Sequence, residues 1–108
     1  MANLSETEIG VIWQKAMAVD GYDNTKYRKD VCGAWIQRDQ YGKETIYGWE
    51  IDHAKPTSKG GSDDAHNLRP MHWQNNRTKA DDYPTYNSAV TSEGNGNVEK
   101  TNSWTIKT

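Results

Sequence analysis

The residues best suited to chemistry in this chain lie in one stretch, from Trp49 to Lys79. That stretch contains polar residues of the kinds that hydrolytic sites use, namely Asp52, His53, Asn67 and Asn76. Cleavage of a phosphodiester needs a water nucleophile, a base that takes its proton, and positive charge that stabilises the leaving oxygen. In such a reaction His53 would be the base.

The neighbours of His53 supply oxygen ligands for a metal ion. Asp52 offers a hard carboxylate and Asn76 an amide oxygen, which suit Mg²⁺ or Mn²⁺ with water and phosphate in the remaining positions. Consecutive strand residues point to opposite faces, so Asp52 and His53 can serve one centre only where the strand ends or twists. The segment Ala54-Lys55-Pro56 follows directly and is compatible with a strand end.

The loop and the cations around this centre have expected supporting roles. We predict that Asn67 orients His53, either by accepting a hydrogen bond from the ring or by fixing the loop backbone. Gly60-Gly61 allows close approach of the loop. Cationic side chains are expected to contact phosphates on either side of the scissile bond: Lys55, Lys59, Arg69, Arg77 and Lys79.

A zinc site is the main alternative use of these side chains, and its ligands would be Cys32, His53, His66 and His72. The four residues do not form the two closely spaced pairs of a structural zinc site, and Asp52 would be left unexplained. We therefore expect no structural zinc. Cys32 is expected to be a small buried apolar residue. His72 is expected either to pack in the interior or to contact the residues that form the site.

The elements that position these residues can be predicted from their composition. Residues 45–52 are β-branched and aromatic, which predicts a strand that ends at the Asp-His pair. Residues 55–67 are a loop, and 67–72 form a second short strand, which Pro70 limits or places at an edge. Residues 73–80 suit a short helix. Two antiparallel strands, a long loop and one helix result.

The rest of the chain is expected to support this core. A helix is predicted over residues 5–18, with Ser5 and Glu8 as a capping box and an apolar face made by Ile9, Ile12, Trp13, Ala16 and Met17. Residues 22–42 read as irregular, with a short strand near 33–37. The polar extension 86–108 forms either a hairpin around residues 93–97 or a disordered end.

Length and composition favour one small α+β domain over residues 1–108, with its core at about 45–80. Five Trp, six Tyr and no Phe predict a thin, aromatic-rich core. A single cysteine excludes an internal disulfide. The N-terminus lacks the basic and apolar regions of a secretion signal, and no long apolar run follows, so we expect a soluble, cytoplasmic protein without membrane contact.

The formal net charge of −2 argues against a nucleic-acid partner, but the charge is unevenly distributed. Between positions 52 and 79 five basic residues face three acidic ones, which gives +2. The remainder has eight basic against twelve acidic residues, which gives −4. The positive charge therefore lies beside the candidate site, although a fluctuation of this size also arises by chance in mixed-charge sequences.

Taken together, these residues resemble the HNH endonuclease family, whose ββα-metal motif has the same residue types in this order: Asp52-His53, Gly60-Gly61, Asn67-Leu68, Asn76 and Lys79. The resemblance covers about residues 47–80. It implies a metal-dependent endonuclease that nicks or cuts DNA, most simply double-stranded DNA. It also implies His53 as the general base, Asp52 and Asn76 as ligands of Mg²⁺ or Mn²⁺, and Asn67 as the residue that orients the base.

The sequence departs from the family pattern at two places. His72 and Asn75 stand where many members carry the second of two zinc-binding cysteine pairs. The third motif residue is Asn76 instead of histidine, which favours Mg²⁺ or Mn²⁺ over zinc. The alternative function is a noncatalytic nucleic-acid-binding or assembly module that keeps this fold, and the net acidity favours it somewhat.

Overall fold

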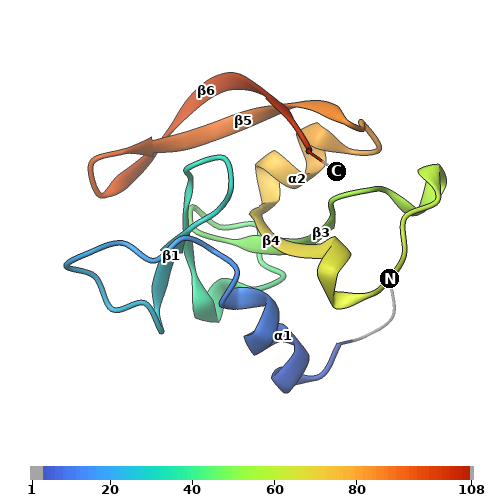
Figure 1. Cartoon of the computed structure of the whole chain (residues 1–108). Coiled ribbons are helices and arrows are strands. Elements are labelled where there is room, and N and C mark those ends of the chain that lie inside the picture. The colour runs from blue at the N-terminus through green and yellow to red at the C-terminus, as the bar shows by residue number, and fades with distance from the viewer. Residues whose placement is uncertain (1–3, 108) are drawn as a thin grey trace.

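The computed structural model describes residues 4–107, which form three two-stranded antiparallel sheets and two short α-helices (Figure 1). In chain order the elements are α1 (Glu6–Trp13), β1 (Tyr27–Lys29), β2 (Trp35–Gln37), β3 (Trp49–His53), β4 (Leu68–His72), α2 (Trp73–Lys79), β5 (Thr85–Glu93) and β6 (Gly96–Thr105). The predicted α+β class is confirmed. None of the helices in residues 4–107 is long and apolar enough to cross a bilayer.

The β3–β4 hairpin and α2 form the centre of the molecule (Figure 1). β3 pairs with β4 so that Trp49 lies opposite His72 and His53 lies opposite Leu68. The predicted start of the first strand at residue 45 is wrong, because residues 45–48 turn back on the preceding loop. At Gly48 a Cβ atom would lie 1.8 Å from the Lys43 carbonyl oxygen, so only glycine allows this turn.

Helix α1 covers one face of the hairpin with the apolar residues that the sequence indicated. Ile9, Ile12 and Trp13 are buried in one cluster with Trp49 and Ile51 from β3. The predicted capping box is present, since the Glu8 N–H donates to Ser5 Oγ at 3.2 Å and the Ser5 N–H donates to Glu8 Oε1 at 3.0 Å. This packing fixes the strand that carries Asp52 and His53.

The predicted end of this helix at residue 18 is wrong, because α1 ends at Trp13. Met17 instead forms a β-bridge with Lys29, with N···O distances of 2.8 and 2.9 Å in the two directions. Its side chain is 46% exposed and does not belong to the apolar face. Strand pairing between distant segments thus overrides the local helical pattern.

The predicted C-terminal hairpin is confirmed and is longer than expected, since β5 and β6 pair from Thr85 with Thr105 to Glu93 with Gly96. It lies along α2 on the side away from α1 (Figure 1). The buried Asn75 side chain joins the two, because its Oδ1 accepts from the N–H groups of Ala89 and Val90 at 2.8 Å each. Its Nδ2 donates to the Val90 carbonyl oxygen at 3.0 Å.

Asp30, which the sequence did not single out, is a buried hydrogen-bond hub. Its carboxylate accepts from the backbone N–H groups of Cys32, Ala34 and His72 at 2.9 Å each, and from Asn75 Nδ2 at 3.1 Å. Burial raises the pKa of Asp30, and these hydrogen bonds oppose that rise. One side chain thus ties the turn after β1 to the end of β4 and to α2.

Candidate active site

The structure brings Asp52, His53 and Asn76 to one hollow between the end of β3 and α2. The hollow has a volume of about 370 Å³, and Thr57 and Asp81 also line it. β3 ends at His53, and the next residue, Ala54, continues the pairing only through its N–H to the Asn67 carbonyl oxygen at 2.9 Å. Consecutive strand residues point to opposite faces, but because β3 ends at His53, Asp52 and His53 can both line this hollow.

His53 has a carboxylate partner that the sequence analysis did not identify. Its Nε2 lies 2.6 Å from Asp63 Oδ1, and the two side chains are 17% and 71% exposed respectively. When the carboxylate accepts the Nε2–H, the lone pair of the ring is on Nδ1. Asp63 was one of two adjacent aspartates in a polar loop, and nothing in that local sequence marked it as the partner.

Asn67 hydrogen-bonds to the loop backbone, which is the second of the two roles predicted for it. Its Oδ1 accepts from the Lys55 N–H at 2.8 Å, and its Nδ2 donates to the carbonyl oxygens of Lys55 at 2.9 Å and Ser62 at 2.8 Å. The loop comes so close here that a Cβ atom at Gly61 would lie 1.7 Å from the Lys55 carbonyl oxygen. Asn67 and Gly61 together hold both ends of the segment between His53 and Asp63.

Asp52 is buried, with only 4% of its surface exposed, and each of its carboxylate oxygens faces a cation. Oδ2 accepts from Arg69 Nε at 2.9 Å, and Oδ1 lies 3.3 Å from Lys79 Nζ. The Lys79 ammonium group also donates to the His53 carbonyl oxygen at 3.1 Å. Such pairing compensates the cost of burying all three charges.

This arrangement divides the five cations that were expected to contact phosphates. Arg69 and Lys79 lie inside, with Lys79 fully buried, and hold Asp52 instead of facing solvent. Lys55 and Lys59 are exposed on the loop after β3. Arg77 is half-exposed, pairs with Glu44 and Glu50, and its guanidinium carbon lies 5.1 Å from the Trp73 ring centroid. Of these five cations, Lys55 and Lys59 face solvent, and Arg77 does so in part while it is paired with Glu44 and Glu50.

Asn76 supplies an amide oxygen to the hollow. Its Nδ2 donates to Glu50 Oε1 at 3.0 Å, which fixes the amide, and within residues 4–107 no protein group donates to its Oδ1. An amide held in this way presents its oxygen without a rotamer change. Of the two predicted metal ligands, Asn76 therefore offers an oxygen without a protein partner within residues 4–107. The charge of Asp52 is already offset by Arg69 and Lys79.

These residues fit an oxygen-ligated divalent cation in the kind of donor they offer. Residues 4–107 contain no cluster of three His, Cys, Asp or Glu side chains of the type that holds a metal unaided. Mg²⁺ commonly uses one or two protein oxygens and takes its remaining ligands from water and substrate phosphate. Because Arg69 and Lys79 already offset the charge of Asp52, the affinity for the cation should depend on a bound phosphate.

His72 and Cys32, the other candidate metal ligands, have structural surroundings. His72 is buried and caps α2, since its Nδ1 accepts from the Gln74 N–H at 3.1 Å while its Nε2 lies 2.8 Å from the Ile46 carbonyl oxygen. Burial lowers the pKa of His72, which keeps the ring neutral. Burial also raises the pKa of the Cys32 thiol to about 12. Neither side chain faces the hollow at Asp52.

Comparison with known proteins gives one match. A family model described as HNH endonuclease matches residues 31–82, which include β2, β3, β4 and α2. No curated protein and no solved structure matches the chain significantly. The match includes every residue that lines the hollow at Asp52.

Proposed function

Over residues 31–82 the chain belongs to the HNH endonuclease family, and we propose that it is a metal-dependent endonuclease that hydrolyses DNA phosphodiester bonds. The observation that carries the proposal is the meeting of Asp52, His53 and Asn76 in one hollow beside exposed cations. The family acts on nucleic acid and generally uses divalent metals. DNA as the substrate and Mg²⁺ or Mn²⁺ as the ion are the specific parts of the proposal.

In the proposed reaction Nδ1 of His53 takes a proton from a water molecule as the water oxygen attacks phosphorus. The bond between phosphorus and the leaving oxygen breaks at the same time. Asp63 favours this role because it accepts from Nε2 and so keeps the lone pair on Nδ1. Asn67 supports it indirectly, by fixing the loop between the two side chains.

Asp52 and Asn76 are the residues that would hold the metal ion. When bound there, Mg²⁺ or Mn²⁺ supplies positive charge to the phosphate oxygens on which negative charge builds up. Lys55 and Lys59, on the exposed loop, and Arg77, on α2, are placed to position the phosphates of the DNA backbone. Contacts with phosphates carry no base preference, so these three cations would position the DNA without reading its sequence.

The first test is nicking of supercoiled plasmid by the purified protein in Mg²⁺ or Mn²⁺. We expect His53→Ala to abolish nicking, since the water loses its base, while the circular dichroism spectrum stays unchanged. His66→Ala is the matched control, because His66 is exposed on the same loop and is expected to keep full activity. Undiminished nicking by His53→Ala would exclude this residue as the base.

A noncatalytic nucleic-acid-binding module is the second candidate, and the pairing of Asp52 with two cations favours it. Mn²⁺ binding separates the two functions. A nuclease should bind Mn²⁺ more tightly in the presence of a noncleavable phosphorothioate duplex, and Asn76→Ala should remove both this binding and nicking. A binding module would bind the duplex with the same affinity with or without Mn²⁺, and would not nick.

A further inference from the structure

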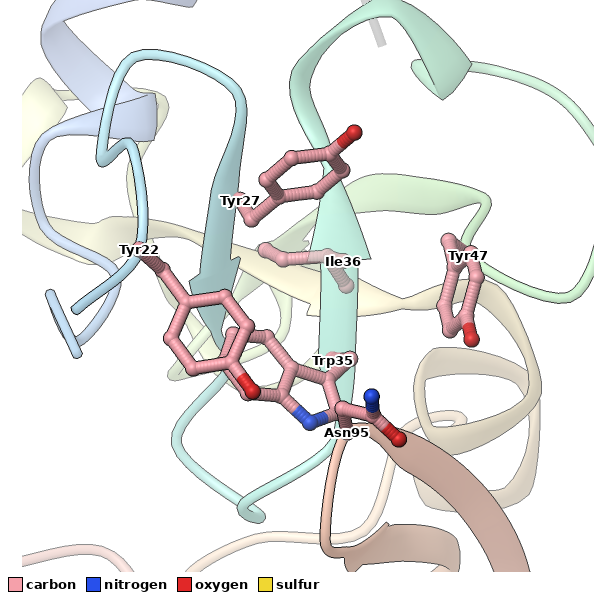
Figure 2. A pocket seen from close by; sticks show the side chains of 6 residues that line it. All are labelled: Tyr22, Tyr27, Trp35, Ile36, Tyr47 and Asn95. Atoms are coloured by element: carbon pink, nitrogen blue, oxygen red, sulfur yellow. The ribbon is translucent and has the colours of Figure 1, made fainter.

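A second hollow, of about 200 Å³, lies at the β1–β2 hairpin and takes no part in the proposed chemistry. Its lining is mostly aromatic: Tyr22, Tyr27, Trp35, Ile36, Tyr47 and Asn95. Figure 2 shows Trp35 and Ile36 from β2 among the tyrosine rings, with Asn95 beside Trp35. Tyr47 lies just before β3 and His53 at its end, so the aromatic hollow and the hollow at Asp52 lie at opposite ends of this strand.

The rings in this hollow are held in place by the C-terminal hairpin. Trp35 Nε1 donates to the Gly94 carbonyl oxygen at 2.9 Å, and its ring centroid lies 4.5 Å from that of Tyr22. The Asn97 side chain accepts from the Trp35 N–H at 2.7 Å and donates to the Trp35 carbonyl oxygen at 2.9 Å. The floor of the hollow is therefore rigid before any ligand arrives.

The upper rings remain available to a ligand. Tyr22 is 42% exposed and Tyr27 is 39% exposed, although both are large and largely apolar side chains. Figure 2 shows Tyr27 and Tyr47 as separate rings, with Ile36 between Tyr27 and Trp35. A planar ring entering the hollow would contact aromatic faces, and its edge would meet tyrosine hydroxyl groups and the Asn95 amide.

Positive charge lies next to these rings. Lys29 Nζ is 5.0 Å from the centroid of Trp35. Tyr27 also lines a third, polar hollow, which contains Lys26, Arg38 and Asp39. Arg38 pairs with Glu6 at 3.2 Å, so Lys26 is the cation that this hollow offers to a phosphate. The carboxylates in the same region are engaged locally, since Asp23 accepts from Thr25 Oγ1 at 2.6 Å and Asp39 accepts from Gln37 Nε2 at 2.7 Å.

We propose that the aromatic hollow binds one unpaired nucleobase of the DNA, with the phosphate of that nucleotide in the polar hollow beside Lys26. The choice of DNA as the ligand rests on the proposed function. Base–aromatic stacking is tolerant of sequence, because every base has a flat face.

The combination of groups favours a nucleotide over an apolar segment of a partner protein. An apolar side chain would leave the rim hydroxyls, the Asn95 amide and Lys29 without partners, which is unfavourable on burial. A nucleobase presents two flat faces and a polar edge, and its phosphate is anionic. The aromatic rings match the flat faces, the hydroxyl and amide groups of the rim match the polar edge, and the neighbouring cations match the phosphate.

The test uses the full chain with His53→Ala, which prevents cleavage, and a fluorescent single-stranded thymidine 12-mer whose binding is followed by anisotropy. We expect Tyr27→Ala to weaken binding by about 5- to 150-fold, the range of one stacked base. Tyr27→Phe should bind as well as the parent, because it keeps the ring. Val11→Ala is the matched control, since Val11 is 51% exposed and lies on α1 outside the hollow.

Two further measurements distinguish the contribution of base stacking from that of the phosphate charge. Tyr27→Ala should leave the salt dependence of binding unchanged, whereas Lys26→Ala should reduce its slope by about one, as expected for a lost phosphate contact. With an oligonucleotide made of abasic sites, Tyr27→Ala should have no effect. Equal affinities of parent, Tyr27→Ala and Val11→Ala for the 12-mer would overturn the proposal, as would a Tyr27→Ala loss that persists on the abasic strand.

These binding measurements do not depend on catalysis. If the protein with intact His53 fails to nick plasmid but the Tyr27 variants bind the oligonucleotides as expected, the endonuclease proposal is wrong and the nucleobase-binding proposal is supported. If nicking occurs but the Tyr27 variants do not bind as expected, the reverse holds. The two proposals can therefore fail separately.

Discussion

At the scale of single residues, the contact between His53 and Asp63 has the sharpest consequence for activity. Without the carboxylate, the neutral ring is free to place its proton on Nδ1, the atom proposed to accept the proton of water. The 2.6 Å contact therefore selects a tautomer as well as an orientation. Asp63 contacts neither metal nor substrate in this scheme and is a positioning residue.

We predict that Asp63→Ala lowers the nicking rate by about 10- to 100-fold, part of the roughly 10²- to 10⁴-fold that a general base contributes. Single-turnover nicking of plasmid measures the rate. Nitrogen-15 chemical shifts of the His53 ring at pH 8 should move from the Nε2–H form toward a mixture of tautomers. Asp64→Ala is the control, and identical shifts and rates in both variants would show that Asp63 plays no such role.

Residue type and order predicted that Asp52, His53 and Asn76 lie near one another, as they do, but not which charges are neutralised. The Asp-His pair, Asn67 and Asn76 follow from residue type and order, because strand, loop and helix signals in this stretch are local. The burial of Arg69 and Lys79 against Asp52 is a matter of tertiary packing. A lysine on a short polar helix normally faces solvent, so no local pattern indicates that Lys79 is fully buried.

At the scale of elements, the start of α2 depends on a neutral histidine. His72 Nδ1 accepts from the Gln74 N–H, and a protonated ring cannot accept there. Burial lowers the pKa of His72 below its ordinary value of 6.5. The unfolded chain therefore binds a proton at a higher pH than the folded chain does, and stability falls as the pH falls below about 6.5.

We predict that the free energy of unfolding contributed by His72 is constant above about pH 7.5 and declines below about pH 6.5. Urea unfolding between pH 5.5 and 8 measures it. His72→Asn, which keeps a capping acceptor, should lose this part of the pH dependence, whereas His66→Asn, at an exposed position, should retain it. The same pH slope in His72→Asn as in the parent would contradict the assignment.

Element boundaries were predictable where the signal lies within a few residues. The capping box at Ser5 and the strand end at His53 are examples, and both are present. The early end of α1 was not predictable, because it follows from the pairing of Met17 with Lys29, and β1 itself has no strong strand pattern. Long-range pairing decides such boundaries, and a single sequence does not display it.

At the scale of the whole molecule, the C-terminal hairpin is part of the core. Tyr86 of β5 packs with Cys32 and Met71, and its ring lies 5.3 Å from the guanidinium carbon of Arg69 and 5.6 Å from Lys79 Nζ. The hairpin thus shields the ion pairs of Asp52 from one side. Its polar composition concealed this role, because few apolar residues carry the contact.

We predict that a chain ending at Tyr83 loses cooperative thermal unfolding, because the buried Asn75 amide and the cluster at Met71 are exposed. Circular dichroism melting measures the loss. Asn75→Ala in the full chain should lower the free energy of unfolding by about 2–4 kcal/mol, since several buried backbone and side-chain partners lose their hydrogen bonds. Lys100→Ala, at an exposed position on β6, should melt as the parent does. A cooperative transition in the shortened chain would contradict this view of the hairpin.

The hub at Asp30 stabilises the fold independently of the metal ion that the proposed reaction would use. It joins the segments around Cys32, His72 and Asn75 through hydrogen bonds that no chelator or oxidant removes. If the proposed function holds, a chelating agent should stop nicking without lowering the thermal stability of the fold, and adding the metal ion back should restore nicking. The protein would then remain folded but inactive when no divalent metal is present.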